Sequence, residues 1–169
     1  MAGRFGRLAT ALAVGGVSVF LSGCASPRPL KPSASAAAEP WVPGLGEIMS
    51  LTQMRHLKLW FAGRDQNWEL ASYETDELEE GFADVVRFHP THKSAPEPLT
   101  VLVPEFTEGP IAALRSAIEQ RDLAAFETGF DALTGGCNGC HRAADFAFNV
   151  VVRPTSNPYS NQRFGLPSP

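Results

Sequence analysis

The chain has 169 residues, of which 44% are hydrophobic, and its formal net charge is −4. This length allows one domain of ordinary size with appended segments. The acidic balance and the lack of any Lys/Arg run exclude nucleic acid as an expected partner, because nucleic-acid-binding surfaces are basic.

Residues 1–23 have the composition of an export signal. Arg4 and Arg7 precede an uncharged apolar stretch over residues 8–21, which is shorter than the roughly 20 apolar residues of a membrane-spanning helix. The signal ends in the tetrapeptide LSGC, which resembles the bacterial lipobox and implies cleavage before Cys24 and lipidation of that cysteine. A transmembrane anchor, or a plain secretory signal with a chance cysteine, is the alternative.

The residue after the lipobox favours an outer-membrane anchor that faces the periplasm. Ala25 stands where Asp would indicate retention in the inner membrane of many bacteria. Cleavage after residue 23 would remove Arg4 and Arg7 but no acidic residue, and so would change the formal charge from −4 to −6. An acidic surface is compatible with a basic redox partner. Residues 24–43 are rich in Ala, Pro and Ser and predict an extended spacer.

Two helices are predicted in the first part of the following segment. The first is expected over residues 45–62, with Gly63 as its C-terminal stop. The second would be capped by Asp65 or Asn67 and would end near Phe88, because His89-Pro90 follows and proline disfavours a helical residue before it.

Prolines then predict a loop over residues 89–105 and a third helix from about Pro110 to Gln120. Asp122 is the expected cap of a fourth helix. That helix has apolar residues at alternating spacings of three and four, as a core-facing helix does: Leu123, Phe126, Phe130, Leu133 and Cys137.

Four helices with short or moderate connections predict an all-α fold, an antiparallel four-helix bundle over residues 44–145. The C-terminal tail, residues 146–169, contains Pro154, Pro158 and Pro167 and a Val-rich stretch. We expect this tail to be extended, to wrap the outside of the bundle, and to contain at most one strand.

The motif that carries chemistry is Cys137-Asn-Gly-Cys140-His141. Cys-x-x-Cys-His is the attachment pattern of c-type haem. Two thiols three residues apart reach the two vinyl groups of one porphyrin and form thioethers. The histidine that follows is placed as the proximal iron ligand. The sequence therefore predicts one covalent haem c, held by Cys137, Cys140 and His141.

Other interpretations of the motif remain open at this stage. A thioredoxin-like dithiol uses the same cysteine spacing but needs a βαβ setting, which the helical pattern does not offer. A disulfide between residues three apart closes a very short loop, so it would remove little entropy from the unfolded chain and would stabilise the fold little. A zinc site would need a fourth ligand from one of the other histidines: His56, His89 or His92.

A helical bundle with its haem motif on the last helix resembles the class II c-type cytochromes, the cytochrome c-prime group. The resemblance covers residues 44–145 and is architectural apart from Cys137, Cys140 and His141. It implies that the two cysteines form the thioethers, that His141 is the proximal ligand, and that a homodimer is allowed. The lipid anchor, the spacer and the tail after the haem motif depart from the family pattern.

In an antiparallel bundle, the end of the fourth helix lies beside the start of the first. The residues expected near the haem are therefore Met49, Phe88, His89, His92 and Phe106. Met49 is the best-placed sixth iron ligand, with core packing as the alternative. Gln53 and His56 share its helix face and would line the distal side. Three arginines are candidates for pairing with haem propionates: Arg142, Arg153 and Arg163.

The expected function is electron transfer in the periplasm by a monohaem cytochrome anchored to a membrane, with an unidentified redox partner. A gas-binding haem protein with an open distal site is the second hypothesis. A structural lipoprotein stapled by zinc or a disulfide is the third. No nucleophile–base pair is present that would indicate an enzyme.

Overall fold

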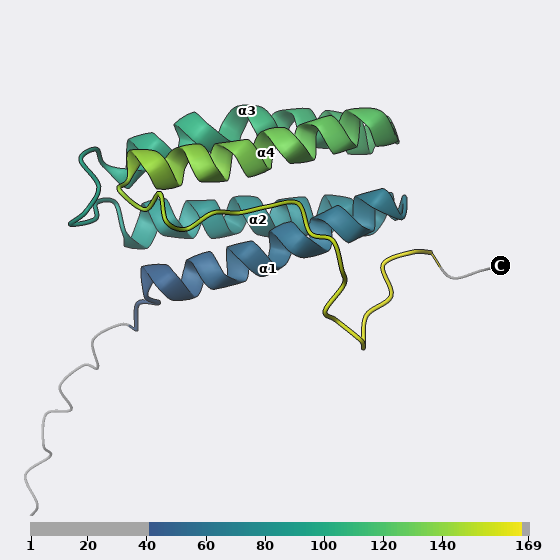
Figure 1. The fold of residues 1–169 in the computed structure, drawn as a ribbon, viewed down its shortest axis with the longest axis horizontal. Coiled ribbons are helices and arrows are strands. Elements are labelled where there is room, and N and C mark those ends of the chain that lie inside the picture. The colour runs from purple at the N-terminus through teal and green to yellow at the C-terminus, as the bar shows by residue number, and fades with distance from the viewer. Residues whose placement is uncertain (1–40, 167–169) are drawn as a thin grey trace, which may run out of the picture. The chain divides into compact units, whose positions relative to one another are not determined.

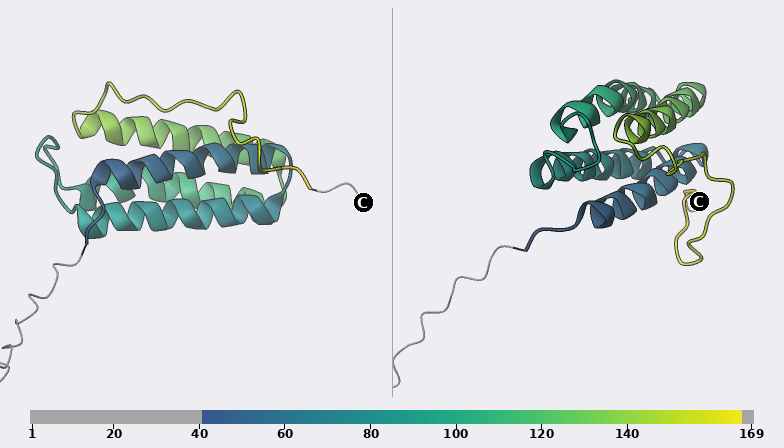
Figure 2. Two further views of the ribbon diagram at one scale, coloured as in Figure 1. Left: turned by 90° about the horizontal axis from the view of Figure 1, so that it is seen from below. Right: turned by 60° about the vertical axis from the view of Figure 1, so that its left-hand side comes forward.

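The computed structural model describes residues 41–166, which form four helices and an extended tail (Figure 1). The helices are α1 (Leu45–Arg64), α2 (Trp68–Phe88), α3 (Leu99–Glu119) and α4 (Leu123–Ala143). Successive helices run antiparallel and pack against each other, and α4 returns to α1 (Figure 2). The predicted all-α four-helix bundle is confirmed, and the tail has no strand in its described part. The predicted signal peptide, Cys24 and nearly all of the spacer lie outside the described residues.

Polar side chains cap two of the helices as the sequence predicts. The Asn67 side-chain oxygen accepts a hydrogen bond from the Leu70 amide at 3.2 Å, so Asn67 and not Asp65 is the cap of α2. The Asp122 carboxylate accepts one from the Ala125 amide at 3.0 Å. Each bond satisfies a first-turn N–H that has no partner within its helix.

Three helices end in a left-handed residue that is not glycine: Gln66, Arg121 and Asp145. In each case the next amide bonds to the carbonyl five residues before it, at 2.7 to 2.9 Å, which closes the last turn. The prediction that Gly63 stops the first helix is therefore wrong. Gly63 is buried inside α1 and lies against the Phe126 ring, where a Cβ would collide. This glycine serves the close approach of α1 and α4.

The predicted loop over residues 89–105 is correct only as far as residue 98, and the predicted helix start at Pro110 is wrong. The helix α3 begins at Leu99, after Pro98, and contains Pro104 and Pro110. Each internal proline costs about 3 kcal/mol, whereas each fully buried aliphatic side chain contributes roughly 1.5–3 kcal/mol. The first turns of α3 offset the penalty by burying three such side chains: Leu99, Leu102 and Val103.

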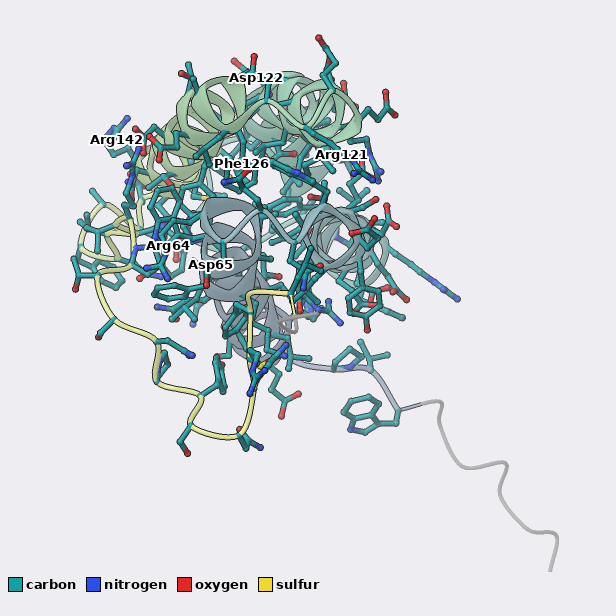
Figure 3. The ribbon with its side chains drawn as sticks, turned by 90° about the vertical axis from the view of Figure 1, so that its right-hand side faces the viewer. Arg64, Asp65, Arg121, Asp122, Phe126 and Arg142 are labelled. Carbon is teal, nitrogen blue, oxygen red and sulfur yellow. The ribbon has the colours of Figure 1, made fainter. Side chains whose placement is uncertain are left out.

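The core has an aromatic half and an aliphatic half. Where α1 ends and α4 begins, Phe61, Phe126 and Phe130 are almost fully buried. Figure 3 looks onto this end of the bundle, with Phe126 pointing inward and Arg142 at the periphery. The opposite end is built around Ile48, Val85, Leu102 and their neighbours. The Cys137–His141 motif lies in this aliphatic half, because α4 ends there.

Candidate functional site

A cavity of about 350 Å³ lies where α1 begins and α4 ends. Its size and mainly apolar walls are typical of cofactor sites, which measure about 300–1,000 Å³ and contain few polar groups. The cavity brings together most of the predicted site residues: Met49, Gln53, His56, His92, Cys137, Cys140 and His141. The apolar walls come mainly from α2 and α3: Leu78, Phe82, Val85, Leu99 and Val103.

The two motif cysteines are half-buried on the α4 wall of this cavity, and neither is in a disulfide. Burial raises the pKa of the Cys137 thiol to about 12, with a smaller contribution from Cys140. Burial also raises the pKa of Cys140. Both groups are therefore thiols at neutral pH, unlike the low-pKa thiolate of a dithiol oxidoreductase. Two protonated thiols one helical turn apart on a cavity wall are suited to thioether attachment.

His141 has a defined tautomer. Its Nδ1 lies 2.6 Å from the backbone carbonyl of Asn149, in the tail. A carbonyl oxygen only accepts hydrogen bonds, so Nδ1 carries the proton and donates. With Nδ1 as the donor, Nε2 is the nitrogen that is left to bind a metal.

A second histidine, His56, is 3% exposed and packs on the Phe130 ring with the centroids 4.4 Å apart. Its Nε2 lies 2.9 Å from the Thr134 hydroxyl, which donates its own proton to the Phe130 carbonyl. His56 Nε2 is therefore the donor to Thr134, and Nδ1 is unprotonated. Burial lowers the pKa of His56 to about 4, so the ring is neutral at pH 7.

The contact between His56 and Thr134 also sets the register of α1 against α4. Met49 precedes His56 by seven residues, and His141 follows Thr134 by seven. Seven residues are close to two helical turns, or about 10 Å, so each step returns to the same helix face. Because the helices are antiparallel, Met49 and His141 lie at the same level of the bundle, and both line the cavity.

Of the two loop histidines, two phenylalanines and three arginines that were also candidates, only His92 lines the cavity. Among the loop histidines, His92 lines the cavity and packs near Phe146, whereas the His89 ring bonds to the Pro43 carbonyl at 2.8 Å. The cavity wall does not include Phe88 or Phe106, although both were expected near the haem. The same holds for the three candidate arginines: Arg142 and Arg163 are exposed, and Arg153 pairs with Asp131.

The zinc interpretation has no assembled site in the described part of the chain. Over residues 41–166, no group of three or more His, Cys, Asp or Glu side chains is placed to hold a metal ion. The donors that line the cavity are the thiols of Cys137 and Cys140, the Met49 thioether and three imidazoles, of which His141 follows the cysteines directly and has Nε2 free. This donor set, with apolar walls, fits a covalently bound haem.

Two residues of this site were missed from the sequence. The side chain of Asn138 and the backbone of Asn149 hold the tail beside the motif. The only signal in the sequence for Asn138 is its position between Cys137 and Cys140, and no signal indicates Asn149.

Comparison with protein-family models, curated proteins and solved structures finds no match to this chain. Among the described helices, none is both long and apolar enough to span a membrane.

Proposed function

We propose that this chain is an exported monohaem c-type cytochrome that carries electrons. The observation that supports it is the placement of Cys137, Cys140 and His141 on one wall of an apolar cavity, with Met49 at the level of His141 on the facing helix. Bound haem would supply a one-electron Fe(III)/Fe(II) couple. No residue pair beside the cavity suggests catalysis on a substrate.

Each part of the chain has a distinct role in this proposal. Cys137 and Cys140 form the thioethers, and His141 presents Nε2 as the proximal ligand. Met49 is the proposed sixth ligand, whose thioether would raise the redox potential. The mainly apolar walls would limit the exposure of the haem to water, and low solvent exposure is itself a determinant of potential.

The cellular setting belongs to the same proposal. Lipidation of Cys24 would hold the domain at the outer membrane on its periplasmic side. The acidic balance of the chain favours a basic redox protein as its partner, because opposite charges speed the encounter.

The test is to express the full chain together with the c-type haem attachment machinery. Covalent haem is then measured by mass and by the spectrum in denaturant. The wild-type chain is expected to hold one haem, and a chain with both Cys137→Ala and Cys140→Ala none. Cys24→Ala is the matched control, because it removes a cysteine outside the motif. It should keep the haem and move the protein from the membrane to the soluble fraction.

A wild-type chain without covalent haem would overturn the proposal. Metal analysis of the same sample would then test the structural zinc alternative.

A further inference from the structure

The tail after the haem motif turns back along the bundle immediately (Figures 1 and 2). Asp145 adopts a left-handed conformation with φ of 63°, and the Phe146 amide bonds to the His141 carbonyl at 2.7 Å. This turn directs the chain back beside α4 and α1. Three tail residues then line the cavity: Phe146, Asn149 and Val151. The tail is thus a wall of the candidate haem site.

The Asn138 side chain holds this wall through two hydrogen bonds to the backbone of Val151, and this pair of bonds is called the Asn138 latch below. The Asn138 side-chain amide donates to the Val151 carbonyl at 2.8 Å, and its oxygen accepts from the Val151 amide at 2.8 Å. Both backbone groups of one tail residue are therefore held by one half-buried side chain. Such a two-point contact fixes position along the tail as well as distance from α4.

The consequence falls on His141. Asn138 and His141 are three residues apart and share one face of α4. Asn149 precedes Val151 by two residues, so the latch places the Asn149 carbonyl beside the ring, 2.6 Å from Nδ1. An imidazole that donates from Nδ1 to a carbonyl is more basic at Nε2 and is held in one orientation.

Other anchors hold the tail further along. Arg153 bonds to Asp131 at 2.9 Å and lies over the Trp60 ring, 4.3 Å from its centroid. Further on, the Asn67 side chain donates to the Phe164 carbonyl at 2.9 Å. Loss of the Asn138 latch should therefore free the tail locally, beside His141, without detaching it from the bundle.

We propose that Asn138 is a positioning residue for the proximal ligand, acting through the backbone of the tail. This inference rests on the proposed haem function. By holding Val151, Asn138 keeps the Asn149 carbonyl on His141 Nδ1. The more basic ligand stabilises ferric over ferrous iron, so the latch lowers the redox potential.

The test compares wild type with Asn138→Ala in the haem-loaded full chain. The reduction potential of the variant should rise, with a change on the order of tenfold in the ferric preference, which corresponds to about 59 mV. The Nδ1 proton of His141 should also exchange with solvent at least about tenfold faster than in wild type. NMR of the reduced protein measures this exchange rate. A second variant, Val151→Pro, removes the backbone N–H that donates to the Asn138 side-chain oxygen. Val151 lies outside the motif. This variant should shift both quantities in the same direction, even if Asn138→Ala impairs haem attachment.

The matched control is Arg153→Ala, which loosens the tail at an anchor that does not contact His141. Its potential and its ring N–H exchange should equal those of wild type. An unchanged potential in both latch variants, with the Val151 contact demonstrably lost, would overturn the inference while leaving the haem function intact. A wild-type chain without covalent haem would instead overturn the proposed function, and the mass measurement distinguishes the two results.

Discussion

Gly136 of α4 lies directly against the backbone carbonyl of Phe106 in α3. That carbonyl would normally accept a bond from the residue four positions later, but this residue is Pro110, which has no N–H. The carbonyl therefore faces α4, where only a residue without a Cβ allows such an approach. The two helices meet closely here, immediately before Cys137.

Gly136→Ala should destabilise the protein, because its Cβ would collide with backbone that cannot move aside. Overpacking of this kind costs about 1–3 kcal/mol. Gly135→Ala is a matched control one residue away, since a Cβ there meets nothing within 4 Å. It should stabilise the helix by about 0.5–1 kcal/mol. Urea denaturation of both variants measures the difference, and equal effects would contradict the close approach.

The elements of the fold could be predicted where local rules and burial agree. The caps Asn67 and Asp122 and the apolar stripe of α4 gave α2 and α4 correctly. The start of α3 was missed because Pro104 and Pro110 are unfavourable locally. The burial that offsets them depends on α1 and α2, which are distant in sequence. A local rule for proline cannot include that contribution.

The site could be predicted only in part, for a similar reason. The cysteine spacing and the helix period place Cys137, Cys140, His141 and Met49, and all four line one cavity. The contact of Asn149 with His141 depends on the path of the tail, which no periodicity encodes.

Stability should fall as the pH is lowered from 7 towards 4, because of His56. Its pKa is about 4 in the folded state and 6.5 for an ordinary histidine, as in the unfolded chain, so the unfolded state binds more protons in this range. The contribution is fully present above pH 6.5 and is lost as the pH falls to about 4. A shift of this size corresponds to roughly 3 kcal/mol. Urea denaturation at pH 7 and pH 5 measures the trend.

His56→Gln is the matched control for this pH dependence. Glutamine can donate to Thr134 as the histidine does, but it does not titrate. Burial raises the pKa of Glu74, which acts with the opposite sign, yet Glu74 is present in both chains. The difference between the two chains therefore isolates His56. Identical pH profiles would show that the histidine is not buried as described.

Phe164 should anchor the tail to the core. This side chain is 3% exposed and packs on Phe61, with ring centroids 5.7 Å apart. Phe164→Ala should reduce the free energy of unfolding by about 3–5 kcal/mol, as truncation of a buried phenylalanine does. Phe148 is the control on the same tail, since it is 81% exposed, and Phe148→Ala should change stability by less than about 0.5 kcal/mol. A Phe164→Ala chain as stable as wild type would refute the docked tail.

Met49 should decide between an electron carrier and a gas-binding protein. If its thioether is the sixth ligand, the haem-loaded wild type has a low-spin spectrum that CO leaves unchanged. Met49→Ala should then become high-spin and bind CO promptly in the reduced state. Met54→Ala is the matched control, because Met54 is a part-buried residue of the same helix that does not line the cavity. Its spectrum should equal that of wild type. A wild-type spectrum that is already high-spin and shifts with CO would contradict ligation by Met49, and an open iron that binds gas would become the leading function.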